Sequence, residues 1–426
     1  MFNTMKNAWK IPDLRNRILF TLLMIVVYRF GAVIPVPFIE HSYIEQMFSS
    51  NSGGLLDFFD LMSGGAFKNF TIFALNIYPY ITASIILQLL AIAFPKLEEI
   101  FRREDGRKKQ VQYTRYLTVI LALIQAVAYA VGLFRNAINP VLGGFTAPMI
   151  VLVLTAGTAF MMWLGEQITD KGIGNGISIL IMIGILARTP VDIGRILYGV
   201  KAGSVSIIAV LVFLIFALVI VAAVIAVQQA ERRIPVQYAK RVVGRKMYGG
   251  QSTHIPMRVL MAGVMPVIFA STFLAIPQTL SFFNPAWKEG IQYWFSIYGG
   301  AASPGLWIYS IVNVVLIIFF TYFYTAVQFN PVEYAQNMKE NGGFIPGIRP
   351  GRPTSDYLSR VLNRITIVGA ICLAFIAIIP TLVFSFTTLQ LGFGGTSLLI
   401  VTGVALETVK QMESQMLMRH YKGFLK

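Results

Sequence analysis

The stretch GGLLDFFDLMSGGAF, residues 53–67, lies between two apolar runs that are long enough to cross a membrane, but it is itself too short to do so. Its apolar core extends from Leu55 to Met62 and includes Asp57 and Asp60. A transmembrane helix needs about 20 apolar residues, so this core cannot form one. The pattern predicts a membrane protein that keeps a short helix between two pairs of glycines.

The composition of the whole chain is that of a protein with many membrane spans. Of the 426 residues, 56% are hydrophobic and only 13% are charged, and the mean hydropathy is +0.67. These values exclude an ordinary soluble domain. The apolar runs are continuous and lack the alternation of membrane strands, which favours an all-α membrane protein. They predict ten transmembrane helices, at residues 18–34, 71–94, 114–134, 147–165, 174–190, 205–228, 257–277, 307–329, 363–385 and 394–411.

The chain has a formal net charge of +16 and an isoelectric point of about 9.9, values that suit either a nucleic-acid binder or a topological signal. With ten spans, about 28 of the 35 lysines and arginines fall on the side of the two termini. The opposite side receives about six, including Arg188 and Arg195. The bias predicts that both termini are cytoplasmic, and it explains the basic charge without nucleic acid.

Two large loops on the predicted cytoplasmic side, about 229–256 and 330–362, carry many of these charges. The first mixes basic residues with β-branched and aromatic ones around a YGG turn, which predicts a short β-hairpin. The second is rich in proline and glycine and carries Arg349 and Arg352 near its tip. Both a solvated loop that only orients the protein and a docking site for an acidic or ribonucleoprotein partner remain open.

No sequence motif indicates catalysis or a cofactor. The chain lacks GxxxxGK, HExxH and GxSxG, and its three histidines and single Cys372 have no metal-ligand spacing. We therefore expect no catalytic residue, no metal and no cofactor. Arg29, Glu166 and Glu407 lie near the ends of their spans, where long side chains can snorkel, so ion coupling has little support. A small-solute transporter and a membrane-anchored scaffold stay as alternatives.

The second predicted span, LNIYPYITASIILQLL, has one apolar and one polar strip. Ile77 and Ile81 are four residues apart and share a face, which is most often a lipid or packing face, and Pro79 is expected to kink the helix close by. Ser84 and Gln88 form a polar strip, suited to bonding with another helix or to lining a gate.

Long strings of the sequence resemble the SecY family, the pore subunits of the general protein-translocation channel of bacteria. The similarity extends over essentially the whole chain, in YRFGAVIPVP, LMSGGAF, PYITASIILQLL, EDGRKKQVQYTRYLT, WLGEQITDKGIGNGISI, QYAKRVVGR, QSTHIP, FNPVEYAQNMK, GFIPGIRPG and FGGTSLLIV. The resemblance implies ten spans in two pseudo-symmetric halves, here residues 1–204 and 205–426, around an hourglass pore.

The family has an apolar ring at the narrowest point of this pore. The matching positions all hold isoleucine: Ile77, Ile81, Ile181, Ile268 and Ile400. A stiff apolar collar of this kind is expected to exclude ions by dewetting and to tolerate many polypeptide sequences, because it forms no specific hydrogen bond.

The resemblance also gives residues 53–67 a role as the plug, a short helix folded into the outer funnel. The plug helix would comprise Leu55, Leu56, Asp57, Phe58, Phe59, Asp60, Leu61 and Met62. Its apolar side would face the ring, whereas Asp57 and Asp60 would fall on the wet side. The glycine pairs would be its hinges: Gly53, Gly54, Gly64 and Gly65.

A sideways exit, the lateral gate, is implied between spans 2–3 and spans 7–8. The matching polar residues are Ser84 and Gln88 on span 2, and Ser271 and Thr272 on span 7. Leu260 stands where many bacterial members have asparagine, which puts in doubt a polar cluster that sets the closed state.

The two basic loops match those that dock partners in relatives. Contact is expected at Arg233, Arg241, Arg245, Lys246 and Arg349, because guanidinium groups suit RNA phosphates and carboxylates alike. The implied function is a channel in the bacterial inner membrane that passes secretory polypeptides and releases transmembrane segments sideways. The implied partners are the SecA motor ATPase, the ribosome, SecE-like and SecG-like subunits, signal peptides, nascent polypeptides and membrane lipid.

Overall fold

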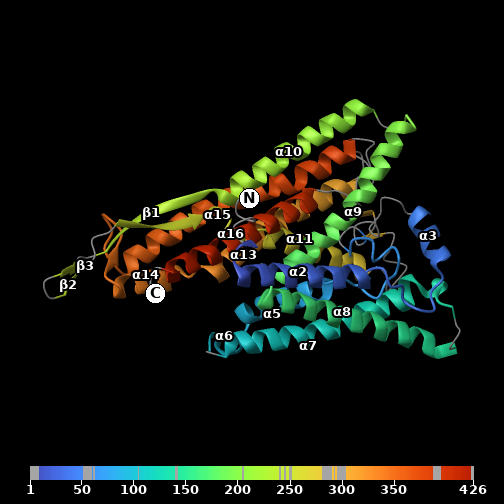
Figure 1. The fold of residues 1–426 in the computed structure, drawn as a ribbon, viewed down its shortest axis with the longest axis horizontal. Helices are drawn as coiled ribbons and strands as arrows, with labels where there is room; N and C mark the ends of the chain where they lie inside the picture. The colour runs from blue at the N-terminus through green and yellow to red at the C-terminus, as the bar shows by residue number, and fades with distance from the viewer. Residues whose placement is uncertain are drawn as a thin grey trace.

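The computed structural model of this chain is largely helical (Figure 1). It describes residues 9–50, 60, 63–103, 105–139, 143–203, 206–238, 241–243, 246–248, 252–280, 290–291, 293–294, 304–386 and 395–423. Each predicted span contains a helix: α2 (Pro12–Gly31), α5 (Tyr78–Ala93), α7 (Gly106–Val127), α8 (Thr146–Lys171), α9 (Gly176–Lys201), α10 (Ile207–Gln229), α11 (Met265–Leu280), α13 (Pro304–Gln328), α15 (Arg352–Phe386) and α16 (Gly395–Gly423). Shorter helices are α3 (His41–Ser50), α6 (Pro95–Arg102), the π-helix η1 (Ala128–Leu133) and the 3₁₀ turns η2 (Arg135–Ala137) and η3 (Gly143–Phe145).

The prediction of a helical membrane protein is confirmed. Among the described residues, six helices are long and apolar enough to cross a membrane, and α5 with α6 adds a seventh if this pair, bent by 113°, is one span. The total of ten spans stays a prediction. The clearest span is α10, which has the highest mean hydropathy, 3.5, and only 11% of its apolar window buried. Such a helix is stable only if lipid surrounds most of it.

Two groups of helices make up the bundle. The first contains α2, α5, α7, α8 and α9, and the second contains α10, α11, α13, α15 and α16. They meet where α5 contacts α11 and where α9 contacts α16. In Figure 1 the blue and cyan helices gather in the lower part and the orange and red helices in the upper part. The helices that carry the predicted ring are therefore those at the junction.

The second span begins later than the sequence suggested. Residues 64–77 form turns, in which Phe70 and Asn76 have positive φ angles of 41° and 52°, and α5 starts only at Tyr78. Pro79 thus sits in the first turn, where its missing N–H costs nothing, instead of kinking the helix. The turns are tied to the segment that follows α2, because the Ile72 N–H donates to the Ile34 carbonyl oxygen at 3.0 Å.

The two basic loops fold together into one unit. Strand β1 (Glu231–Tyr238) pairs antiparallel with β4 (Ser252–Arg258), and β2 (Arg241–Val243) with β3 (Lys246–Tyr248), which confirms the predicted hairpin (Figure 1). From the second loop, β5 (Gly343–Phe344) follows α14 (Pro331–Glu340) and adds to β1. Beneath this sheet lies a separate hydrophobic core of Ile234, Val236, Met257, Phe329, Met338, Ile345, Leu358, Val361 and Leu362. We call this assembly the docking unit, after the docking role that the resemblance predicts for its two loops.

Candidate functional site

The five isoleucines of the predicted ring all belong to the main hydrophobic core of the protein. Ile77 is the N-cap of α5, and Ile81 is in its first turn. Ile181 comes from α9, Ile268 from α11 and Ile400 from α16, and none of the five is more than 5% exposed. The structure thus brings together side chains from both helix groups. Their β-branched chains are stiff and offer no hydrogen bond, and we call this group of five the isoleucine junction.

A polar cavity of about 470 Å³ opens on one side of this junction. It lies at the end of the bundle that carries the docking unit, because Arg258, the last residue of β4, lines it together with Gln228, Glu407 and Lys410. Val264 and Gly403 also line it, one turn from Ile268 and Ile400. Residues three or four apart share a helix face, so the isoleucines lie just beyond the cavity.

Leu260, the departure from the family pattern, also lines this cavity and is buried. A Cβ on Gly369 of α15 would approach a Leu260 methyl carbon to 3.1 Å. The leucine thus packs closely against α15.

The predicted gate residues lie on α5 and α11, which contact each other. On α5, the Gln88 amide donates to the Ser84 hydroxyl at 3.1 Å. On α11, Ser271 and Thr272 are buried, and the Thr272 hydroxyl donates to the Ile268 carbonyl oxygen at 2.8 Å. These two bonds each stay within one helix, so they do not join α5 to α11.

Part of the predicted plug lies outside the described residues: Gly53, Gly54, Leu55, Leu56, Asp57, Phe58, Phe59, Leu61 and Met62. Its end is described. Gly64 and Gly65 have φ angles of +67° and +89°, a region that favours glycine. A Cβ on Gly64 would lie 2.6 Å from the Gly184 carbonyl oxygen, so this turn rests directly on α9.

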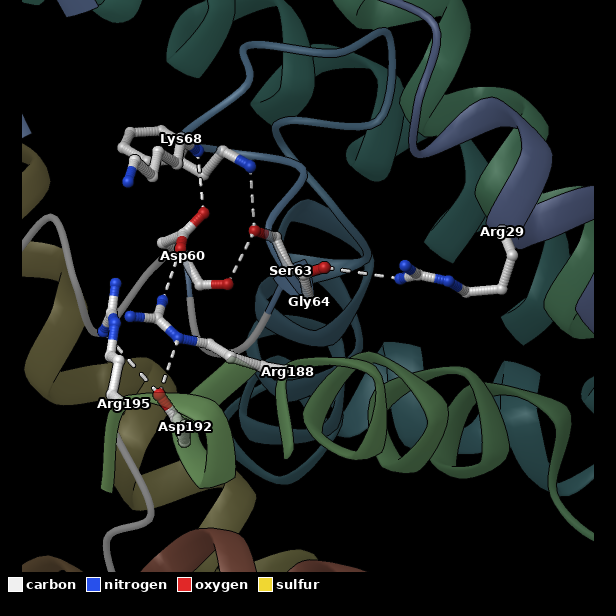
Figure 2. A network of polar contacts seen from close by, with 9 residues as sticks. Arg29, Asp60, Ser63, Gly64, Lys68, Arg188, Asp192 and Arg195 are labelled. Atoms are coloured by element: carbon white, nitrogen blue, oxygen red, sulfur yellow. Dashed lines mark hydrogen bonds and ion pairs between the residues drawn. The ribbon is translucent and has the colours of Figure 1, made fainter. Parts of the chain in front are cut away.

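Asp60 corrects the sequence-based expectation of a wet face. It is 2% exposed and accepts hydrogen bonds from the Lys68 backbone N–H at 2.7 Å and from Nη1 of Arg188 (Figure 2). The Ser63 hydroxyl donates to the Asp60 carbonyl oxygen at 3.1 Å and accepts from the Phe67 N–H at 3.0 Å. The carboxylate therefore faces α9 and its own turn rather than water.

Arg188 was missed as a site residue: it was counted among the charges on the side opposite the termini, although the predicted span 174–190 includes it. It lies inside α9 and is 6% exposed. Its Nε is 3.8 Å from Oδ1 of Asp192, and Nη1 of the half-exposed Arg195 is 3.6 Å from the same oxygen. The available signal was the i,i+4 spacing of opposite charges in a continuation of an apolar run, since ionisable groups there usually have partners.

The end of α2 also holds this turn. Nη1 of Arg29 donates to the Gly64 carbonyl oxygen at 3.3 Å, and the Tyr28 hydroxyl donates to the Ser63 carbonyl oxygen at 3.4 Å (Figure 2 shows the Arg29 contact). Arg29 thus points to the protein rather than snorkelling to the membrane surface.

Glu166, considered for ion coupling, has a structural partner. Its two carboxylate oxygens accept from Nε and Nη2 of Arg115 at 2.8 and 2.7 Å, a two-point contact between α8 and α7.

The predicted docking residues occupy the docking unit. Arg233 on β1 is exposed and pairs with Glu231 at 2.8 Å, and Arg349 is exposed in the second loop. The Arg349 carbonyl oxygen accepts from the Thr354 hydroxyl at 2.9 Å, which fixes the backbone at this point. Arg241 and Lys246 fall on β2 and β3, whereas Arg245 lies outside the described residues.

Comparison with known proteins matches this geometry to one family. The SecY family model matches residues 71–409. The protein translocase subunit SecY of Streptomyces galbus is 48% identical over 449 residues, covering 100% of both chains. That of Thermotoga maritima is 44% identical, covering 100% of this chain and 98% of the relative. The chain belongs to the SecY family.

Solved structures agree on the fold. One, from work on the SecY plug domain that stabilises the closed state and seals the membrane, has a TM-score of 0.67 at 20% identity and covers 94% of this chain and 92% of its own. Another, Sec61 from a canine ribosome-channel complex of the endoplasmic reticulum, has a TM-score of 0.64 at 18% identity with the same coverage. At these identities the likeness shows a SecY-type fold.

Proposed function

We propose that this SecY-family chain forms the pore of a protein-translocation channel in the inner membrane of a bacterium. The channel passes unfolded secretory polypeptides across the membrane and releases transmembrane segments sideways into lipid. Both termini face the cytoplasm, in keeping with the bias of lysine and arginine. The chain supplies no catalytic residue, and the energy comes from a partner.

The observation that carries this proposal is the buried isoleucine junction beside a polar cavity. Side chains from α5, α9, α11 and α16 meet there, so small movements of the two helix groups apart would open it. An apolar constriction excludes ions by dewetting when closed. It also lets different side chains pass, because it reads none of them by hydrogen bonds.

The contact between α5 and α11 supports a lateral gate, with Ser84 and Gln88 on one side and Ser271 and Thr272 on the other. Residues 53–67 serve as the plug, with Gly64 and Gly65 as the hinge on the described side. One solved structure with a similar fold has a plug domain that maintains a membrane seal, which supports this role. The positive φ angles of both glycines support it as well.

The docking unit receives the partners on the cytoplasmic side. Its exposed Arg233 and Arg349, together with Arg241, Arg245 and Lys246, suit the phosphates of ribosomal RNA and the carboxylates of a SecA motor. The ribosome complex of the Sec61 relative supports the first partner. SecE-like and SecG-like subunits complete the channel, and signal peptides, nascent chains and lipid contact its gate.

Crosslinking of a stalled secretory polypeptide tests the pore. Single cysteines replace Ile81, Ile181, Ile268 or Ile400 in a Cys372→Ser background, and Ile215→Cys on the exposed face of α10 is the control. We expect crosslinks at the four buried positions and none at 215. A stalled chain that reaches Arg349→Cys but none of the four would leave the docking surface intact and refute the pore.

A further inference from the structure

Three charged side chains are buried together where the proposed plug ends. Asp60 is 2% exposed, Arg188 6% and Asp192 1% (Figure 2). Charges in such a place are costly unless they are paired, and intramembrane pairs usually mark functional sites. If these residues only filled space, apolar side chains of similar volume would stabilise the fold at least as well. The cluster therefore calls for a role that needs charge.

The pair between Asp60 and Arg188 joins two parts of the chain that could otherwise separate. Arg188 is fixed in α9, whereas Asp60 belongs to the turn that also contains Ser63 and Gly64. The carboxylate additionally accepts from the Lys68 N–H, and Phe67 beside it is buried in the main core, so release has to break this bond as well. Loss of the ion pair would remove the charged contact between this turn and α9, which lies beside the packing of Gly64 on Gly184.

Arg188 has a second carboxylate within reach on its own helix. Asp192 lies one turn further along α9, with Oδ1 at 3.8 Å from Nε of Arg188, longer than a hydrogen bond. The helix keeps this spacing whatever Asp60 does. When Asp60 leaves, Arg188 can turn to Asp192, a carboxylate that stays beside it on the same helix. Asp192 therefore lowers the free energy of the released state.

We propose that Asp60 and Arg188 form a releasable ionic clamp that holds the end of the proposed plug, at Asp60 and Ser63, on α9, and that Asp192 is the resident counter-ion that receives Arg188 on release. The inference rests on the proposed function of residues 53–67 as a plug that must be displaced. It predicts opposite effects for the two aspartates that share Arg188. Removing the charge of Asp60 weakens the closed state, whereas removing that of Asp192 weakens the released state.

Labelling of a cysteine at Ser63 tests the clamp, because Ser63 is 1% exposed in the attached turn. The full channel complex in vesicles carries Ser63→Cys in a Cys372→Ser background and is treated with a membrane-impermeant maleimide, with and without a stalled secretory polypeptide. Asp60→Asn should raise the resting labelling rate several-fold. Asp192→Asn should lower the labelling that the polypeptide induces. Asp105→Asn, an exposed aspartate before α7, is the matched control and should change neither rate.

The outcomes separate the clamp from the plug. If the polypeptide raises labelling of Ser63→Cys but neither aspartate variant shifts it, or both shift it in the same direction, the clamp is refuted and the plug stands. If the polypeptide leaves labelling unchanged, displacement of the plug is itself refuted, and the clamp with it. Arg188→Lys offers a second variant: it keeps the charge without the planar fork, and intermediate labelling supports the clamp.

Discussion

Gly64 rests against the backbone of Gly184: a Cβ added to Gly64 would lie 2.6 Å from the Gly184 carbonyl oxygen. Gly64 also has a φ angle of +67°, which an L side chain adopts at a cost of about 1 kcal/mol or more. Two glycines from segments far apart in the sequence thus allow the end of the proposed plug to approach α9.

Gly64→Ala should therefore lift the turn from α9 and raise the resting ion conductance of the channel in planar bilayers. Gly65→Ala is the matched control, because Gly65 has a φ angle of +89° but, within the described part of the chain, no atom within 4 Å of an added Cβ. Both substitutions strain a backbone with a positive φ angle, but only Gly64→Ala also places a methyl group against the Gly184 carbonyl oxygen. Equal conductance of the two variants would show that the close approach to Gly184 does not hold the closed state.

Ile181→Asn should increase ion leak roughly tenfold, because a polar group in the isoleucine junction keeps water there and defeats dewetting. Ile181→Val, which keeps a β-branched apolar chain, should leak little. The check is single-channel conductance at rest. If Ile181→Asn did not increase ion leak, the result would favour a membrane-anchored scaffold over a pore.

Arg349→Glu should impair transport driven by SecA or a ribosome while the protein still folds and inserts. The residue is exposed, so its reversal changes the charge of the docking surface without disturbing the core. Arg135→Glu, exposed in η2 far along the chain from both basic loops, provides the control. The measurement is translocation of a secretory precursor into vesicles at equal channel abundance. Normal transport by Arg349→Glu would show that this residue is not part of the docking surface.

Leu358→Ala should loosen both basic loops together. Leu358 is fully buried in the core of the docking unit, and such a truncation costs about 2–5 kcal/mol. Hydrogen exchange should quicken at residues 231–238 and also at 343–345. Exposed Leu417→Ala should leave both unchanged. Faster exchange in only one of the two loops would mean that they fold independently.

The sequence was a good guide wherever a signal is local. Apolar runs predicted helices in all ten windows, and β-branched residues around a YGG turn predicted the hairpin of β1 and β4. The signal for the start of α9 is also local, because the Asn175 side chain caps this helix by accepting from the Ile177 N–H at 3.1 Å. Such features depend on neighbours within a few residues.

The features that escaped prediction depend on distant partners. Helical periodicity places Asp60 on a polar face, and nothing near it indicates that Arg188, 128 residues later, covers it. Likewise, β5 pairs with β1 at Gln237 and Phe344. A strand of two residues is too short to be predicted from its own sequence. The turns that precede the late start of α5 are bonded to the segment that follows α2, which lies far back in the sequence.

Strand β5 has a mechanical consequence. The hairpin of β1 and β4 connects α10 to α11, and the loop that contains β5 connects α13 to α15. Because β5 is bonded to β1, a force applied to either loop is shared by all four helices. A motor that pushes on one loop would not bend that loop alone. It would tilt much of the second helix group as a single lever, relative to the first group at the contact of α5 with α11.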